Sequence, residues 1–268
     1  MEKLEIISNF IIWFVVYSIA GWVYEVIICS IEQRHYVDRG FLHGPYCPIY
    51  GAGAVVNLLI MGNIDNAAVL FLAGMVTTTT LEYITSVVME KLFYARWWDY
   101  SQMRFNLNGR VCLLGSLVFG AMITLLIKVV HPAVSGITDQ IPSMYRNITA
   151  AALLIILILD TVFSAMRMSA FNEKLNGLQK KINDALGAYK TRALDLRSAI
   201  AKRTKREDEA RLNRETSEIF MRMTRFERKI MRVFPRFKSV RYSDALEQLK
   251  EKSKDFIISR RKAGKDKN

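Results

Sequence analysis

Residues 6–31 read IISNFIIWFVVYSIAGWVYEVIICSI, an apolar run of 26 residues in which Glu25 is the single charged side chain. At about 1.5 Å per residue, a helix of this length can cross the roughly 30 Å hydrocarbon core of a bilayer. Three further runs are as apolar, at residues 67–89, 111–130 and 148–166. The sequence therefore predicts an integral membrane protein with four long spans.

A fifth apolar run, residues 48–62, is short enough either to span or to re-enter. Lys and Arg in the links decide between these readings, because cytoplasmic links are enriched in them. The link after the first run holds Arg34 and Arg39, and residues 91–110 hold four such residues, whereas residues 62–66 hold none. The alternation requires five crossings. It predicts an N-terminus outside and a C-terminal tail in the cytoplasm.

The charge divides the chain into two expected domains. Residues 1–166 hold nine Lys and Arg against eleven Asp and Glu, and residues 167–268 hold 29 against 14. The first part is expected to be the transmembrane domain, and the second a basic cytoplasmic helical tail, partly coiled coil. The fold class is therefore all-α. The heptad-like apolar positions of the tail are Phe171, Leu175, Leu178, Ile182, Ala185 and Tyr189.

The tail suggests three kinds of contact. Its excess of Lys and Arg favours membrane lipids of an anionic leaflet. Its apolar stripe would pack on neighbouring tail helices or on a second copy, as a homodimer. Nucleic acid is the weaker expectation, because acidic residues interrupt the positive charge and no nucleic-acid-reading motif is present.

Three carboxylates lie at matched depth inside the spans. Counted from the nearest charged residue toward the cytoplasm, Glu25, Glu82 and Asp160 lie roughly 10 to 13 Å deep at about 1.5 Å per residue. A carboxylate at such depth is costly unless it faces water or a partner, so we expect one shared interior site. The alternative is that hydroxyls or an Arg satisfy each carboxylate separately.

Residues 40–51, GFLHGPYCPIYG, join the first span to the short apolar run and are too apolar for an ordinary surface link. Glycines permit close approach, and Pro45 and Pro48 stiffen the backbone. We expect a re-entrant loop that brings Arg39 into the field of the carboxylates and places His43 and Tyr50 at the site. A rigid surface turn is the alternative.

Five motifs follow one another in a characteristic order. They are GWVYE (21–25), DRGFLHGPYCPIYG (38–51), EYITSVVME (82–90), WWDYS (97–101) and FNLNGR (105–110). In this order between apolar spans, they resemble the CmpB family, a bacterial multi-span family classed with ABC-transporter permeases. The resemblance covers about residues 10–165 and leaves the basic tail outside. One departure is Asp38, where the family usually has Asn.

The resemblance implies a location in the bacterial cytoplasmic membrane and a role for the motif residues. These are Glu25, Arg39, Gly40, Gly44, Pro45, Pro48, Gly51, Glu82, Glu90, Trp98, Asp99, Asn106 and Arg110. The chain has no phosphate-cradling GxxxxGK[ST] motif, so an ATPase would be a separate subunit.

Three functions remain open from the sequence. The first is a permease or membrane subunit of a transport system, with a polar site facing the cytoplasm. The second is an inner-leaflet enzyme acting on a lipid head group or lipid-linked substrate, with a carboxylate as base and Arg39 or Arg110 holding phosphate. The third is a structural or regulatory membrane protein that recruits partners through its tail.

No cofactor is predicted. Cys29, Cys47 and Cys112 lack the paired spacing of a zinc site, and the three histidines show no ligand spacing either. A metal-dependent variant of the first two functions would use Mg²⁺ or Mn²⁺, because carboxylate oxygens suit these ions.

Overall fold

A computed structural model describes the backbone of residues 2–195, 198–234 and 236–265, and side-chain environments for residues 3–187, 209–234 and 236–254. The described chain is mainly helical, and its strands are short two-residue pairs. It divides into two compact units. The first comprises Met1–Met89 and Trp98–Met166, and the second comprises Glu90–Trp97 and Arg167–Asn268. Residues 90–97, which the sequence-based division left in the membrane domain, thus group with the tail.

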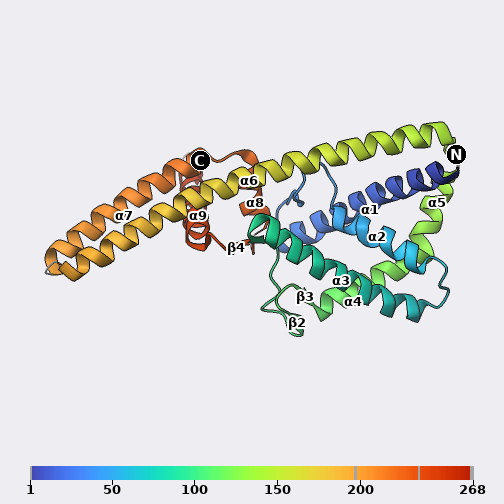
Figure 1. The fold of residues 1–268 in the computed structure, drawn as a ribbon, viewed down its shortest axis with the longest axis horizontal. Helices are drawn as coiled ribbons and strands as arrows, with labels where there is room; N and C mark the ends of the chain where they lie inside the picture. Colours follow the sequence, from blue (N-terminus) through green and yellow to red (C-terminus); the bar gives the residue numbers. More distant parts are fainter. Residues whose placement is uncertain (1, 196–197, 235, 266–268) are drawn as a thin grey trace. The chain divides into compact units, whose positions relative to one another are not determined.

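Four apolar stretches of the described helices are long enough to cross a bilayer: Lys3–Gln33, Ala67–Phe93, Leu113–Asp139 and Ser143–Gly187. They belong to helices α1 (Glu2–Gln33), α3 (Ala67–Phe93), α4 (Leu113–Leu125) with its continuation, and α6 (Ser143–Asp195). Helices α1 and α3 run in the same direction in the first unit (Figure 1). The arrangement confirms the predicted all-α, polytopic bundle with one short helix.

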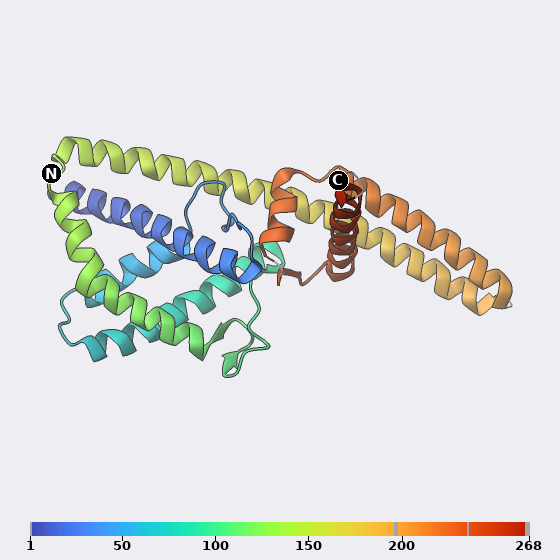
Figure 2. The ribbon, with the colours of Figure 1, turned by 180° about the vertical axis from the view of Figure 1, so that it is seen from behind.

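The short helix α2 (Pro48–Met61) begins beside the middle of α1 rather than at its end. The amide of Cys47 donates to the carbonyl of Ser18 at 2.9 Å, although α1 continues to Gln33. The segment 34–47 therefore runs back along α1 over fifteen residues, or about 22 Å. The segment and α2 together carry the chain from one end of the first unit to the other, as Figure 2 shows from behind.

A close crossing holds α2 against α1. A Cβ added to Gly51 would overlap the Oγ of Ser18 and the carbonyl oxygen of Phe14. Ser18 itself is fully buried, and its hydroxyl donates to the Phe14 carbonyl at 2.7 Å. Small residues at this crossing let two helices of the bundle approach without a gap, as is common inside membranes.

Residues 131–147, which join the apolar runs 111–130 and 148–166, are mostly helical. A π-helical turn, η1 (Leu126–Val130), continues α4 into α5 (His131–Asp139), with Pro132 in the first turn of α5. Pro132 cannot donate a hydrogen bond to the preceding turn, and a π-helical turn before it is a common form of such an interruption in a continuous helix. A buried core between α1, α2, α3, α4 and η1 consists of Tyr17, Ala54, Leu58, Met61, Leu70, Ile123 and Ile127.

The second unit is built on the continuation of α6. It contains α7 (Ser198–Met221), α8 (Arg225–Val233), β4 (Lys238–Ser239) and α9 (Ser243–Lys265), and β4 pairs antiparallel with β1 (Ala95–Arg96). Phe171, Leu175 and Leu178 of the predicted apolar stripe are fully buried. Ile182 is also buried, whereas the environment of Tyr189 lies outside the described side chains.

Candidate functional site

Glu25 on α1 is held by Arg39 of the segment 34–47 and by Tyr50 of α2. Its Oε2 accepts from the Nε of Arg39 at 2.8 Å, and its Oε1 accepts from the hydroxyl of Tyr50 at 3.0 Å. Burial, the largest single effect, lowers the pKa of Arg39, but the neighbouring acidic groups, with Glu25 first, together raise it. Arg39 therefore remains a cation, and the pair carries no net charge.

The backbone around Arg39 is fixed by a tryptophan. The indole nitrogen of Trp22 donates to the carbonyl of Arg39 at 2.7 Å. The next residue, Gly40, has a φ of +114°, which side-chain-bearing residues rarely adopt. The glycine thus allows the turn that presents Arg39 to Glu25.

Asp160 on α6 receives the tip of the loop. The amide of His43 donates to its Oδ1 at 3.1 Å, and the amide of Gly44 donates to its Oδ2 at 2.8 Å. The hydroxyl of Tyr46 donates to the same Oδ2 at 2.6 Å, and Ser164 donates to Oδ1 at 3.1 Å. Consecutive backbone amides that converge on one anion form a nest. Asp160 therefore anchors the loop to α6.

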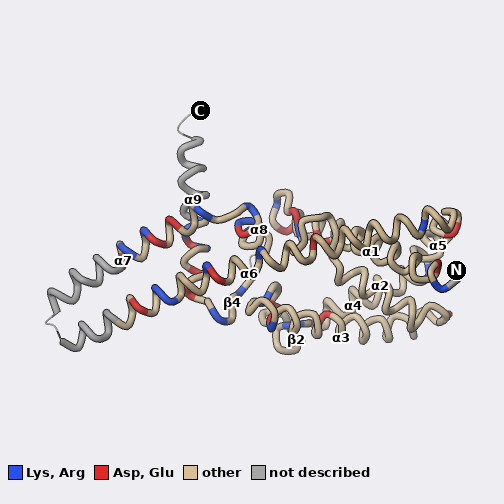
Figure 3. The backbone as a smooth tube through the Cα atoms, turned by 45° about the horizontal axis from the view of Figure 1, so that its top comes forward, with Lys and Arg blue, Asp and Glu red and all other residues tan. Residues whose placement is uncertain are grey.

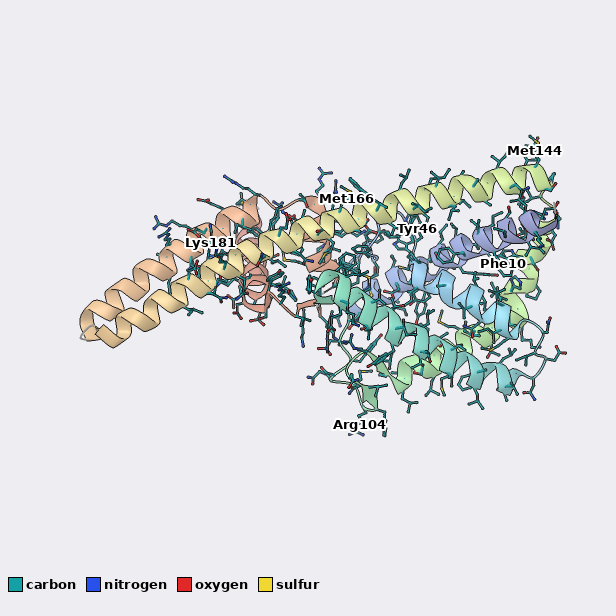
Figure 4. All side chains as sticks on the ribbon, viewed as in Figure 1. Phe10, Tyr46, Arg104, Met144, Met166 and Lys181 are labelled. Atoms are coloured by element: carbon teal, nitrogen blue, oxygen red, sulfur yellow. The ribbon has the colours of Figure 1, made fainter. Side chains whose placement is uncertain are left out.

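Two further groups complete this anchor. The Nδ1 of His43 lies 3.0 Å from the Ser164 hydroxyl and 3.3 Å from Asp160 Oδ1. Burial, followed by the neighbouring Asp160, raises the pKa of Tyr46, so its phenol remains a donor. Figure 4 labels Tyr46 beside α6, on the side that faces α1. The loop is thereby tied to α1 through Glu25 and to α6 through Asp160.

Glu82 on α3 differs from these two carboxylates. Its residue surface is only 7% exposed, and its Oε1 accepts from the hydroxyl of Tyr100 at 3.2 Å. Among the described residues, its Oε2 has no hydrogen-bond partner although that atom is buried. Most buried polar atoms in proteins do have a partner, so this oxygen is an exception.

Tyr100 connects Glu82 with the Glu25 group. Its pKa is raised by burial first and then by negative charge, with Glu82 the largest such contribution and Glu25 also contributing. The phenol therefore stays protonated as a donor, and it lies within the electrostatic reach of both carboxylates. With Arg39 paired to Glu25, the group Glu25, Arg39 and Glu82 has one formal negative charge in excess.

The link that carries Tyr100 is folded by the motif residues Trp98, Asp99, Asn106 and Arg110. Strands β2 (Asn106–Leu107) and β3 (Val111–Cys112) pair around a turn, in which Asn108 and Gly109 have φ of +54° and +68°. Such positive angles are typical of an Asn-Gly type I′ hairpin turn. The FNLNGR motif is therefore a tight hairpin.

Each of these four candidates makes a local hydrogen bond. Asn106 Oδ1 accepts from the Gly109 amide at 2.9 Å, and Asp99 Oδ1 accepts from the Ser101 amide at 3.0 Å. Trp98 donates to the Arg110 carbonyl at 2.9 Å. The guanidinium of Arg110 donates to Ser86 at 3.0 Å, one helical turn from Glu82 on α3. The first three bonds shape the link, and Arg110 joins it to α3.

Glu90 belongs to the second unit, whereas Glu25, Glu82, Asp99 and Asp160 belong to the first. Its Oε2 accepts from the Nε of Arg96 at 2.7 Å. The preceding tryptophan of the WWDYS motif, Trp97, is buried in that unit against Phe234 and Phe237 at centroid distances of 5.1 and 5.2 Å. Trp97 is therefore part of the core of the second unit.

Several residues at the site were not predicted from the sequence. Tyr46, Tyr100, Trp22 and Ser164 are not among the predicted site residues. Tyr100 and Trp22 lie within motifs, which is the signal that could have found them. Ser164 lies one turn after Asp160, and that i, i+4 spacing was the available sign.

The described residues contain no group of three or more His, Cys, Asp or Glu side chains placed to hold a metal ion. The three cysteines are free thiols. The carboxylates instead face an Arg, phenols, hydroxyls and backbone amides. These donors suit charge pairing and hydrogen bonding with a polar ligand.

Replacing Gly44 by Val should loosen the loop tip. A Cβ at this position would overlap the ring of Tyr46, whose hydroxyl is bonded to Asp160. We expect the free energy of unfolding, measured by denaturant titration in detergent, to be about 1–3 kcal/mol lower than in the parent. Tyr46→Phe, alone and combined with Gly44→Val, tests the cause: coupled effects support displacement of the phenol, and strictly additive effects contradict it.

Comparison with known proteins gives one informative match. No curated protein and no solved structure matches the chain. The profile of the CmpB family, described as "Putative ABC-transporter type IV", matches residues 12–165. The match covers more than half of the chain and all of the motifs in the first unit. The chain therefore belongs to this ABC-transporter type IV family of membrane proteins.

Proposed function

We propose that the first unit binds and conducts a solute with a cationic group, as the membrane subunit of a transport system. The observation that carries the proposal is the buried carboxylate of Glu82, with an oxygen that lacks a partner among the described residues. Ionisable side chains inside membrane bundles are costly and mark solute or ion pathways. A cation would compensate the charge that Arg39 leaves unneutralised.

The donors and acceptors around Glu82 support a polar rather than an apolar solute. Tyr100 contributes a phenol, and Thr79 donates to Ser116 at 2.7 Å on the neighbouring helices α3 and α4. A cationic group at Glu82 would meet its negative charge directly, and it would meet a second negative charge at Glu25 once it displaced Arg39. Its binding would also relieve the repulsion between the two carboxylates.

The re-entrant loop is the proposed gate. Besides the buried side chains of Val37 and Leu42, it is attached to α1 and α6 through polar contacts at Glu25 and Asp160. Such contacts can be exchanged for contacts with a solute. Arg39 is its cationic element. A solute cation that competes for Glu25 would displace Arg39 and release one side of the loop.

The proposed orientation places the loop end of the first unit in the cytoplasm. The links 34–47 and 98–112 lie at that end and carry Arg34, Arg39, Arg104 and Arg110 (Figure 1). At the other end Arg146 is paired with Glu5 at 2.9 Å. In a bacterial cytoplasmic membrane, this orientation would make the loop accessible to a separate ATPase subunit, as the family description suggests.

The proposal predicts an unusual response of the Glu82→Gln variant. Because glutamine keeps the shape and removes an uncompensated charge, we expect the variant to be more stable than the parent by about 1–3 kcal/mol without added ligand. Thermal unfolding of the purified full chain would be followed with Na⁺, K⁺, Mg²⁺, Mn²⁺ and spermidine as probes. At least one probe should stabilise the parent and leave the variant unchanged.

The matched control is Glu90→Gln, which removes a carboxylate of the second unit that is paired with Arg96. It should keep the parent's response to the stabilising probe. If no probe distinguishes the parent from Glu82→Gln, Glu82 does not bind a cation and the transport proposal loses its basis. Uptake of the stabilising probe into proteoliposomes, with and without Glu82, then distinguishes conduction from binding alone.

A further inference from the structure

A dense basic surface follows the end of α7. Residues 222–242 contain eight Lys and Arg and a single acidic residue, Glu227. We call this set the basic surface, and most of its side chains are exposed. Its members are Arg222, Arg225, Arg228, Lys229, Arg232, Arg236, Lys238 and Arg241.

The fold separates the positive charges from their single acidic neighbour. Glu227 is buried, caps the start of α8 through Thr224 and accepts from the Nζ of Lys174 at 2.6 Å. The apolar side of α8, including Phe226 and Ile230, is buried in the second unit. Arg225, Arg228 and Arg232 recur at three- and four-residue spacing, so they share the opposite, exposed face. Figure 3 marks these cations along α8 in blue.

Strand pairing ties this surface to the end of a membrane span. Ala95 pairs with Ser239 and Arg96 with Lys238, and the amide of Val240 donates to the Tyr94 carbonyl at 2.8 Å. Tyr94 directly follows Phe93, the last residue of the apolar span Ala67–Phe93. Two or three residues of extended chain reach no more than about 10 Å. Lys238 and Arg241 therefore lie close to where α3 leaves the bilayer.

The side chains mixed with these cations suit an interface. Tyr94 and Val240 are 43% and 58% exposed, and the guanidinium carbon of Arg241 lies 5.1 Å from the Tyr94 ring centroid. Exposed aromatic and apolar groups beside Lys and Arg are typical of segments at head-group level.

We infer that the basic surface binds the anionic head groups of phospholipids in the bilayer that holds this chain. Charge complementarity favours an anionic partner, and the attachment to residues 94–96 places the surface near the bilayer. This inference does not depend on the function proposed for Glu82. The binding would fix the second unit against the leaflet through head-group phosphates.

Native mass spectrometry of the detergent-purified full chain tests the inference, with phosphatidylglycerol and phosphatidylcholine as probes. The variant Arg225→Gln/Arg228→Gln/Arg232→Gln removes three exposed charges. We expect its tightest phosphatidylglycerol site to weaken by about 100-fold, since each charge near an anionic surface contributes several-fold in affinity. Phosphatidylcholine binding should remain within about threefold of the parent.

The matched control, Lys180→Gln/Arg211→Gln/Arg214→Gln, removes three exposed charges of the same unit that lie outside the basic surface. It should retain tight phosphatidylglycerol binding, and both variants should keep the circular dichroism and unfolding temperature of the parent. Equal losses in the two variants, or equal affinity of the parent for both lipids, would overturn the inference. Tighter binding of a short RNA duplex than of phosphatidylglycerol, seen as displacement of the lipid by less RNA than lipid, would also overturn the inference.

A second measurement locates the binding at a bilayer. The fluorophore NBD is attached at Val240→Cys in a full chain with Cys29, Cys47 and Cys112 replaced, and the protein is placed in nanodiscs. A quencher on lipid head groups should reduce the fluorescence more in discs that contain phosphatidylglycerol. Quenching that does not depend on phosphatidylglycerol in the discs would contradict a membrane-bound surface. So would a fluorescence that responds to soluble glycerophosphoglycerol but not to phosphatidylglycerol in the discs.

Discussion

Replacing Asp160 by Ala is expected to free the re-entrant loop from α6. The substitution leaves two backbone amides, the Tyr46 hydroxyl and the Ser164 hydroxyl without the acceptor that they share. The network is partly buried, and each hydrogen bond to a charged group contributes about 1.5–3 kcal/mol, so the loss of several is expected to cost about 3–5 kcal/mol. We expect a loss of unfolding free energy of this size in the purified protein, measured by denaturant titration in micelles.

A chemical readout distinguishes loop release from general destabilisation. In a background without native cysteines, Leu42→Cys, at a buried position of the loop, should react slowly with a maleimide when Asp160 is present and at least about tenfold faster after its replacement by Ala. Asp160→Asn keeps one acceptor oxygen and should give an intermediate rate. Asp65→Ala, which removes an exposed carboxylate bound by Lys128, is the matched control. Equal labelling rates in all variants would show that Asp160 does not hold the loop.

Gly51→Val is expected to have the second large effect, because it forces two helices apart. The added Cβ would overlap the Phe14 carbonyl oxygen and Ser18 Oγ, and the backbone oxygen cannot rotate away as a side chain could. Overpacking of this kind typically costs about 1–3 kcal/mol and occasionally more. We expect a lower yield of folded protein and a lower midpoint of denaturant unfolding.

The control for this prediction is Gly136→Val in α5, where an added Cβ would meet nothing within 4 Å. It introduces the same side chain into a helix without a close neighbour, so we expect it to leave the unfolding midpoint nearly unchanged. A second-site change, Ser18→Ala, removes one of the two overlapping atoms. If Gly51→Val proves as mild as Gly136→Val, the close approach of α1 and α2 is wrong.

The hydropathy of the chain was sufficient to predict the membrane bundle. Long apolar runs such as residues 6–31 and 148–166 have few alternatives, because only helices satisfy their backbone groups within a single segment in lipid. The division in charge after residue 166 predicted a separate basic tail in the same way. Depth along the spans singled out Glu25, Glu82 and Asp160, and the unusual apolar composition of residues 40–51 singled out the loop that follows Arg39.

The identities of the partners could not be obtained from such patterns. Depth along a helix is a local property, and it placed Glu25, Glu82 and Asp160 at similar levels without showing which groups face them. The Arg39 to Glu25 pair joins residues 14 apart, whereas the loop amides that bind Asp160 come from more than 110 residues away. Only the tertiary arrangement that brings the loop to α6 creates that second contact.

The same distinction between local and tertiary information applies to the grouping of residues 90–97 and to the surroundings of Glu82. Sequence determined that residues 6–31 and 67–89 enter a membrane and that the tail is basic and helical, because hydropathy and charge act on each segment independently of the rest. Tertiary structure decided that residues 90–97 join the tail through β1 and β4, and that Glu82 faces Tyr100 with one oxygen left over. Strand pairing and burial depend on where distant segments meet, and no local pattern of residues specifies that meeting.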